Sequence, residues 1–262
     1  MKLFPVANVL LCASSSLAAP GTAARRQRAL ESRLRRTNPA LPVPVDNASN
    51  IQNVDSEYTQ NWAGAVLLGT GYTTVSGTIV VPEPAIPAGG STSRSYAAAA
   101  WVGIDGSTCQ SAILQTGVDF IMQNGVGSYE GWYEWYSDYS YTFTGFKISA
   151  GDTIAMSVTT TSKNSGSVTL DNKTTGKSVS HTFANQEGDL CQTNAEWIVE
   201  DFLQGNSLVP LVDFATVTFT NATVNGKADL SGATIYDIKQ GNTVYTACSA
   251  VDSTSVTCAY TG

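Results

Sequence analysis

The segment "CQTNAEWIVEDF", residues 191–202, places three carboxylates in an apolar run, although only 13% of the chain is charged. If the segment is a β-strand, its side chains alternate between two faces. One face then carries Asn194, Glu196, Ile198, Glu200 and Phe202, and the other carries Ala195, Trp197, Val199 and Asp201. The Trp-Ile-Val run favours a strand over a helix, in which Glu196 and Glu200 would repel each other at i,i+4. We therefore expect two acids on one strand face, partly removed from water.

Strand-like segments recur through the body of the chain. They are rich in Val, Thr, Ile and aromatic residues and are separated by Gly, Asn, Asp and Ser. Ten further segments span 72–82, 96–105, 131–139, 153–161, 167–172, 178–183, 214–224, 233–239, 242–248 and 255–260. No stretch offers a convincing helix with caps. This pattern predicts one all-β domain, an antiparallel sandwich. Between two of the segments, "EPAIPAGGSTSRS" (83–95) predicts a loop open to proteolysis.

The amino-terminal residues differ from this body. Residues 1–19 have Lys2, an apolar run and small residues before Pro20, which predicts a secretory signal peptide. Residues 20–54 form a Pro-containing basic segment, which we interpret as a pro-segment. Its charges up to residue 53 are six arginines against Glu31 and Asp46: Arg25, Arg26, Arg28, Arg33, Arg35 and Arg36. We therefore expect a secreted, extracellular protein whose mature domain spans residues 55–262.

The body of the chain is strongly acidic. From residue 54 onward it holds 7 Lys and Arg against 19 Asp and Glu. Such a surface argues against nucleic acid or an anionic membrane as a partner. At low pH the carboxylates are neutral and few cations remain to repel one another. The composition therefore suits a protein that functions at acidic pH. We also expect the protein to be a monomer.

Four cysteines remain outside the predicted signal peptide, and an even number in a secreted chain predicts two disulfides. Three pairings are possible. Cys248 with Cys258 closes a short loop, which leaves Cys109 with Cys191. The sequons at Asn172 and Asn221 predict glycosylation sites.

Several chemistries lack the residues they need. His181 is the only histidine and lies in a strand pattern, so it is interpreted as a surface strand residue. It is accompanied by no motif of a serine or cysteine hydrolase. One histidine and paired cysteines cannot supply the usual metal ligands, and no Gly-rich loop opens a helix. We expect neither metal nor cofactor, which leaves carboxylate chemistry.

Two acids on one apolar face indicate raised carboxyl pKa values, as an acid or base catalyst requires. The same pattern also fits an edge strand protected by charge. A second cluster, "YEGWYEWYSDY" (129–139), places Trp132, Glu134 and Tyr136 on one face, which favours a binding cleft over core packing alone. A third stretch, "AWVGIDGSTCQSAILQTG" (100–117), offers Trp101, Asp105 and Gln115.

Together these stretches resemble the motifs of the glutamic peptidases, or eqolisins, which are secreted acid proteases. The matching motifs are "NWAGAV" (61–66), "WVGIDGSTCQSAILQTG" (101–117), "WYEWY" (132–136) and "CQTNAEWIVEDF", in the family's order. The resemblance covers roughly residues 57–262. It implies a sandwich of two large curved antiparallel sheets, with the architecture of concanavalin A-like lectins and glucanases. Ser137 departs from the family pattern, in which Pro usually follows "WYEWY".

The resemblance also implies the site. The family's catalytic glutamine corresponds to Gln115 rather than Gln110, and the family's catalytic glutamate corresponds to Glu200 rather than Glu196. Trp101, Asp105, Trp132 and Glu134 match positions that line the cleft and support the pair. The expected activity is acid endopeptidase cleavage of protein or peptide substrates, with the pro-segment as an intramolecular inhibitor. Glu196 receives no role.

Two alternatives share the expected architecture. A glycoside hydrolase would use Glu134 and Glu200 as its acid and nucleophile. It would leave Gln115 without a role, and the close pair of acids often found on one strand in such enzymes is missing. A non-catalytic carbohydrate-binding module would use the aromatic cleft alone.

Overall fold

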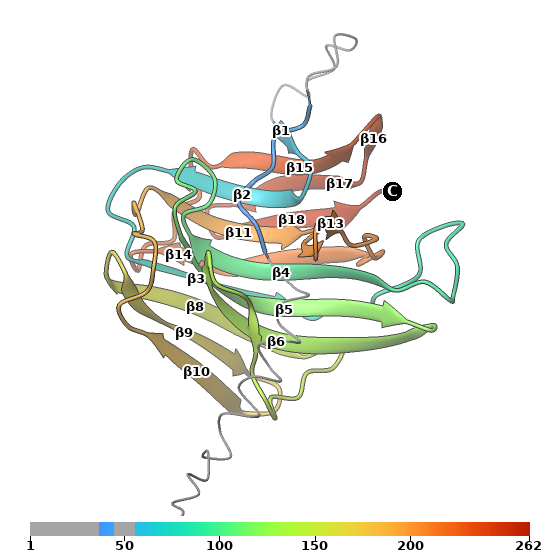
Figure 1. Cartoon of the computed structure of the whole chain (residues 1–262), viewed down its shortest axis with the longest axis horizontal. Helices are drawn as coiled ribbons and strands as arrows, with labels where there is room; N and C mark the ends of the chain where they lie inside the picture. Colours follow the sequence, from blue (N-terminus) through green and yellow to red (C-terminus); the bar gives the residue numbers. More distant parts are fainter. Residues whose placement is uncertain (1–36, 45–55) are drawn as a thin grey trace, which may run out of the picture.

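The computed structural model describes residues 37–44 and 56–262, which fold into two β-sheets packed face to face (Figure 1). The predicted signal peptide and most of the predicted pro-segment lie outside the described residues. No helix in the described ranges has the length and apolar character needed to span a bilayer.

The first sheet has nine strands. Its order is β1 (Ser56–Thr59), β15 (Thr234–Gln240), β2 (Trp62–Leu68), β11 (Asn194–Glu200), β4 (Tyr96–Ile104), β5 (Ile113–Gln123), β6 (Val126–Tyr136) and β7 (Tyr141–Thr142), with β16 (Thr243–Val244) paired to β15. Neighbouring strands are antiparallel except β1 and β15, which are parallel. The opening segment of the sequence therefore becomes β11, a central strand rather than a charge-protected edge.

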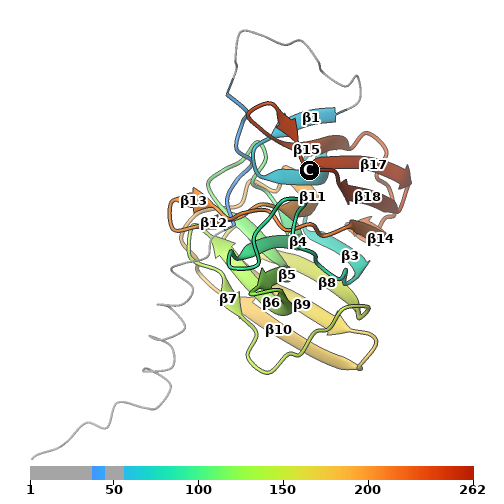
Figure 2. The same ribbon diagram turned by 90° about the vertical axis from the view of Figure 1, so that its right-hand side faces the viewer.

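The second sheet has seven strands. Its order is β10 (Lys177–Phe183), β9 (Ser165–Asn172), β8 (Thr153–Ser162), β3 (Thr74–Val80), β14 (Thr216–Val224), β18 (Ser255–Tyr260) and β17 (Thr246–Asp252). A short hairpin of β12 (Leu203–Gln204) and β13 (Ser207–Leu208) follows β11. Figure 2 shows the two sheets as separate layers, which confirms the predicted all-β sandwich.

The main core fills the space between the layers. Ala195, Trp197 and Val199 point into it from β11, as the predicted alternation requires. The indole N–H of Trp197 donates to the Ser76 carbonyl oxygen on β3, at 2.8 Å, and so joins the two sheets. Close strand packing explains Gly64 on β2, where an added Cβ would lie 2.0 Å from the Trp197 carbonyl oxygen.

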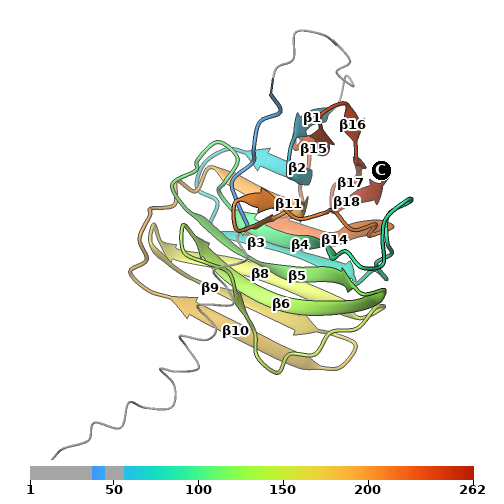
Figure 3. The same cartoon turned by 45° about the vertical axis from the view of Figure 1, so that its right-hand side comes forward.

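A second, smaller apolar cluster covers the opposite face of the first sheet. It includes Trp62, Trp101, Trp132, Ile198 and Phe202, all of them buried. Residues 37–44 lie along this face and cross β2 (Figures 1 and 3). The face that the sequence predicted to carry Glu196 and Glu200 is therefore the one that this leader segment covers.

The sequence patterns missed two long strands, β2 and β5, as well as the short strands β1, β7, β12 and β13. Residues 62–68 include the small residues Ala63, Gly64 and Ala65, and residues 113–123 carry Gln115, Gly117 and Asp119 on the face that lines the cleft. The sequence pattern did not predict β2 because its small residues have low strand propensity. It did not predict β5 because polar residues occupy the face that lines the cleft.

Other predictions have mixed outcomes. Both predicted disulfides, Cys109–Cys191 and Cys248–Cys258, are present. Asn172 is a correction: its side chain is buried and its Nδ2 donates to Asp152 at 2.8 Å, so the folded chain has no room for a glycan there. Asn221 is exposed and stays a predicted acceptor. His181 is half-buried and stacked on Tyr133, with 4.1 Å between ring centroids, rather than freely exposed.

Candidate active site

Glu200 ends β11 on the cleft face, where it lies between Trp62 of β2 and Ala99 of β4. Its carboxylate is fully buried and accepts three hydrogen bonds. The Trp101 indole N–H donates to Oε2 at 2.9 Å, while the Asn38 backbone N–H and the Asn61 amide donate to Oε1 at 3.0 and 3.4 Å. Three donors on one carboxylate form a site that can accommodate its charged form.

Opposing effects act on the pKa of Glu200. Burial raises it well above the ordinary glutamate value, and the nearby charge of Glu134 raises it further. The hydrogen bonds from Asn38, Trp101 and Asn61 lower it, because they stabilise the carboxylate. The net direction is upward, and the three hydrogen bonds are the contacts that oppose it by stabilising the carboxylate.

Gln115 reaches the same place from β5. It is fully buried and lies opposite Glu134 of β6 in the strand register. Its Nε2 donates to the Thr37 hydroxyl, and that hydroxyl donates in turn to Glu134 Oε2. Within the described residues Gln115 Oε1 has no hydrogen-bond partner. The amide therefore offers a donor and a free acceptor beside Glu200.

Residues 37–42 lie across both groups. Thr37 and Asn38 are buried, and the Asn38 carbonyl oxygen accepts from the Trp62 indole at 2.8 Å. Further along, the Ala40 N–H donates to the Gly106 carbonyl at 3.1 Å, and the Leu41 N–H donates to Asn61 Oδ1 at 2.8 Å. Gln115 and Glu200 thus contact two consecutive residues of one extended peptide.

Aromatic side chains wall the cleft. Trp62 and Trp101 meet edge to face, with ring centroids 4.9 Å apart. Trp132 is buried beside Gly117 in the register of β5 and β6. Sequence reasoning assigned no role to Asn61, Trp62, Thr37 or Asn38. The motif "NWAGAV" could have pointed to the first two, whereas no sequence signal marks the others.

Asp105 lies at the other end of β11, where its carboxylate bonds to residues 192–194 and not to the described leader residues 37–44. Its carboxylate accepts backbone N–H bonds from Gln192, Thr193 and Asn194 at 2.8, 2.8 and 3.1 Å. Its own φ is 69°, a left-handed conformation that Asp tolerates better than most residues. The Cys109–Cys191 disulfide joins the same two loops. These contacts fix where β11 begins.

Glu196 is the second acid on the cleft face of β11. It is fully buried between Val66 of β2 and Gly103 of β4, and neither carboxylate oxygen has a hydrogen-bond partner within the described chain. Burial raises its pKa well above the ordinary value, and the charge of Asp105 adds to the effect. Both effects favour the neutral form of Glu196 in the fold.

No group of three or more His, Cys, Asp or Glu residues in the described ranges could hold a metal ion. Gln110, the alternative glutamine, is exposed, whereas Gln115 is inside the cleft. The structure brings Gln115, Glu134, Glu200 and Trp101 together, with Trp132 in the adjoining wall. Asp105 and Glu196 make no hydrogen bond to Thr37 or Asn38 within the described residues.

Comparison with known proteins adds a family to this geometry. The model of the Peptidase A4 family matches residues 60–260. Aspergillopepsin-2 of Aspergillus niger is 47% identical over 283 aligned positions, which cover 99% of this chain and 100% of that protein. Scytalidopepsin B of Scytalidium lignicola is 43% identical over 268 positions, covering 97% of each. A crystal structure of scytalido-glutamic peptidase with a transition state analog inhibitor aligns with a TM-score of 0.70 and 46% identity, over 77% of this chain and 98% of that one.

Proposed function

Because the chain belongs to the Peptidase A4 family and is a glutamic-type endopeptidase, we propose that Gln115 and Glu200 form its catalytic pair. One observation carries this assignment: Gln115 Nε2 and Glu200 Oε1 contact Thr37 and Asn38, two consecutive residues of a peptide lying in the cleft. The pair thus contacts the two residues that one peptide bond joins, Gln115 through the Thr37 side chain and Glu200 through the Asn38 N–H. Family membership leaves the glycoside hydrolase and the carbohydrate-binding module without support.

Glu200 is the proton-transfer residue in this proposal. As a carboxylate it takes a proton from water, whose oxygen attacks the carbonyl carbon of the substrate. It then returns that proton to the amide nitrogen as the carbon–nitrogen bond breaks. The contact between the Asn38 N–H and Oε1 supports this role, because it places a peptide nitrogen 3.0 Å from the carboxylate.

Gln115 stabilises the negative oxygen that forms when water adds. Its Nε2 donates to the Thr37 hydroxyl oxygen in this structure, and in a substrate complex the same donor would meet the oxyanion. Unlike a carboxyl, the amide keeps its donor at every working pH. Trp101 and Asn61 orient Glu200 through their hydrogen bonds, and Glu134 supports the Gln115 side of the cleft.

The leader segment acts as an intramolecular inhibitor in this scheme. Residues 37–42 occupy the groups that a substrate would need, and Thr37 and Asn38 help to seal Glu200 from water. The six arginines before Thr37 lie outside the described residues. They oppose a strongly acidic body, so protonation of its carboxylates at low pH would weaken the attraction and favour release.

We also propose that the protein is secreted. The predicted signal peptide, the two disulfides and the relation to fungal acid proteases support an extracellular protein made as a precursor.

The catalytic assignment is tested by acid proteolysis with Glu200→Gln and Gln115→Ala. We expect a loss of at least about 10³-fold in kcat/KM for the glutamate variant and about 10²–10³-fold for the glutamine variant. Circular dichroism and thermal unfolding establish that each variant is folded. A folded variant of either kind with near-normal activity would remove that residue from the catalytic pair.

The inhibitory role is tested in the full-length precursor. Thr37→Val removes the hydroxyl shared by Gln115 and Glu134, so the lag before peptide cleavage on acidification should shorten. Thr37→Ser retains the hydroxyl and is the matched control. A separate variant with all six arginines replaced by glutamine tests the electrostatic part, which fails if inhibition is unchanged.

A further inference from the structure

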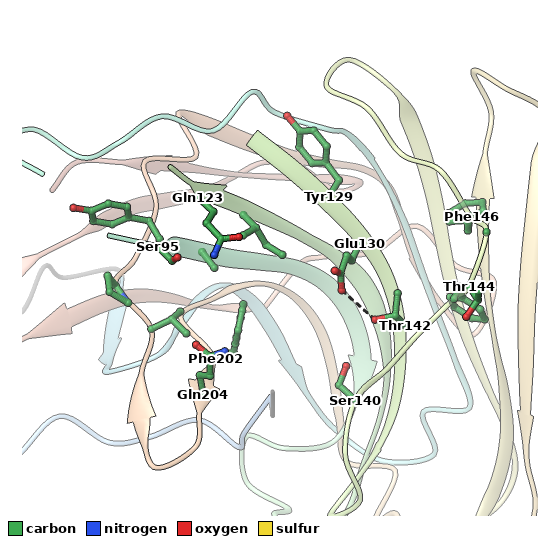
Figure 4. Close-up of a pocket in the computed structure, with 17 residues that line it drawn as sticks. Ser95, Gln123, Tyr129, Glu130, Ser140, Thr142, Thr144, Phe146, Phe202 and Gln204 are labelled. Atoms are coloured by element: carbon green, nitrogen blue, oxygen red, sulfur yellow. Dashed lines mark hydrogen bonds between the residues drawn. The ribbon is translucent and has the colours of Figure 1, made fainter. Parts of the chain in front are cut away.

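A shallow hollow of about 190 Å³ lies on the outer face of the second sheet, on the opposite side of the sandwich from the catalytic pair. It is separate from a hollow of about 630 Å³ on the cleft face of the first sheet, which Phe202 and Glu130 border (Figure 4). The smaller hollow is bounded by β3, β8 and β9 and by Asn221 of β14. No function assigned above uses it.

The strands around the smaller hollow alternate between the core and the outer face. Val75 and Ile79 of β3, Met156 of β8 and Leu170 of β9 point into the core. The outward positions form rows of small polar residues: Ser76, Ser157 and Thr169 in one row, and Thr78, Ala155 and Asp171 in the next. Ala155 has the shortest of these side chains, so the hollow lies over its methyl group with hydroxyl groups around it.

Asn221 reaches this face because β14 contains a β-bulge. The register shifts between Thr220 and Thr223, so that Asn221 and Ala222 together lie opposite Gly77 of β3. Ala222 is buried in the core, whereas Asn221 is exposed. The φ of Asn221 is 51°, in the left-handed region that Asn tolerates better than most residues. The bulge therefore places the Asn221 side chain at the rim of the hollow.

The residues that follow Asn221 make it an acceptor for a sugar. Ala222 and Thr223 complete the Asn-X-Thr pattern that N-glycosylation requires. Ala155 lies two strands from Asn221, across β3, which corresponds to about 10 Å at the usual spacing of strands. The two linked N-acetylglucosamines at the base of an N-glycan can span that distance. A glycan on Asn221 would therefore begin at the rim of the hollow and reach its floor.

The groups around the hollow suit a sugar. Serine and threonine hydroxyls both donate and accept hydrogen bonds, as sugar hydroxyls and acetamides need, and the Ala155 methyl can pack against the C–H groups of a ring. Among the described residues that line the hollow, Asp171 alone is charged. Hydrogen bonds from Ser178 and Lys173 hold the pKa of Asp171 below its ordinary value. Asp171 therefore remains an anionic acceptor for sugar hydroxyls in acid.

We propose that Asn221 carries an N-linked glycan whose first two sugars lie in this hollow, over Ala155 and against Ser157 and Asp171. The proposal rests on the proposed secretion, because N-glycans are added along the secretory pathway. Such a glycan covers the outer face with hydroxyl groups that do not titrate, so this face stays hydrated at the pH where the carboxylates of the body become neutral. It also stabilises the fold, because its binding site is absent from the unfolded chain.

Occupancy is tested with the full-length precursor expressed in a eukaryotic host that adds N-glycans. Peptide mass mapping of the secreted protein, before and after enzymatic deglycosylation, should find a glycan on Asn221. A secreted protein with unmodified Asn221 would overturn the glycan. Retention of the protein inside the cells would instead contradict the proposed secretion, so the two failures are distinguishable.

The position of the glycan is tested by urea unfolding at one acidic pH, with the same sequence made without glycans in a bacterial host as the reference. The glycan should raise the equilibrium constant for folding by about 10-fold. Ala155→Leu fills the hollow and should bring this factor to about one. Thr159→Leu, on the same strand and face but outside the hollow, is the matched control and should retain the factor.

A direct measurement on the glycosylated wild type does not depend on any variant. Nuclear Overhauser effects should connect ring protons of the first two sugars to the Ala155 methyl group. Either the absence of this contact or an equal stabilisation by the glycan in wild type and Ala155→Leu would mean that the glycan extends into solvent, and would overturn its placement in the hollow.

Discussion

Glu196 and Glu200 lie four residues apart on the same face of β11, and both are fully buried, yet their surroundings differ. Glu200 accepts hydrogen bonds from Trp101, Asn38 and Asn61. Glu196 has no hydrogen-bond partner on either oxygen within the described residues. Burial raises the pKa of both, but only Glu200 has donors that stabilise its charged form.

This difference separates two meanings of a buried acid. A carboxyl with donors can pass between its neutral and charged forms, which proton transfer requires. A buried carboxyl without donors favours its neutral form, and ionising it would lower the stability of the fold. A raised pKa therefore does not identify a catalytic residue without the hydrogen bonds that make ionisation possible.

The largest expected contrast is in activity. Glu200→Gln should lower kcat/KM by at least about 10³-fold, because a glutamine cannot take the proton. Glu196→Gln should remain within about 10-fold of wild type when assayed well below its unfolding temperature, since its amide costs about 1–3 kcal/mol of folding stability rather than a catalytic group. Peptide hydrolysis by the two purified proteins at one acidic pH measures both effects. If Glu200→Gln and Glu196→Gln both fold and lose activity equally, Glu196 is needed for catalysis as much as Glu200.

A second expectation concerns stability as a function of pH. Folded-state pKa values above the ordinary carboxyl value mean that the unfolded chain loses protons that the folded chain keeps. This part of the stability is fully present below about pH 4 and is lost as pH rises toward the folded-state values. Glu196 contributes in this way, and so does Asp201, whose pKa burial raises to about 8 against the hydrogen bond from Gln240.

The size of this effect follows from linkage. A group of this kind costs about 1.4 kcal/mol per pH unit, so the contribution of Asp201 should fall by on the order of 3 kcal/mol between pH 4.5 and 6.5, and that of Glu196 should fall in the same direction. Glu196→Gln and Asp201→Asn should each flatten the decline in urea unfolding measured across this range. The exposed Glu187→Gln should leave the slope unchanged. A wild type that gains stability over this range would show that these carboxyls are ionised in the fold.

The alternation of side chains along a strand was enough to predict which face of its strand each residue occupies. It placed Glu196 and Glu200 on one face of β11 and Trp197 on the other, and the packing of Trp197 in the core agrees. It also placed Trp132 and Glu134 on one face of β6, across from β5. These predictions succeeded because a strand in a sandwich must alternate its side chains between two environments.

Contacts between distant segments were beyond the same reasoning. Gln115 could be chosen over Gln110 only through the family resemblance, and its strand, β5, carries polar residues on the cleft face that obscured it. The partners of Glu200 come from β4, from the residue before β2 and from the leader. The local sequence pattern predicts neither the pairing of these strands nor the position of Thr37 and Asn38 on the sheet. Both depend on the register between segments far apart in the chain.

The smallest expected effect tests the hydrogen bonds directly, by making Glu200 more like Glu196. Trp101→Phe removes the donor 2.9 Å from Oε2 while keeping an aromatic ring against Trp62. Because that donor stabilises the carboxylate, its loss raises the pKa of Glu200 further, and the acid limb of the kcat/KM profile should move to higher pH by less than about one unit, or roughly 1 kcal/mol. Trp132→Phe is the matched control, since the Trp132 indole N–H has no hydrogen-bond partner in the described chain and its loss should leave the limb in place. The same shift in both variants, or no shift for Trp101→Phe, would mean that burial rather than hydrogen bonding sets the titration of Glu200.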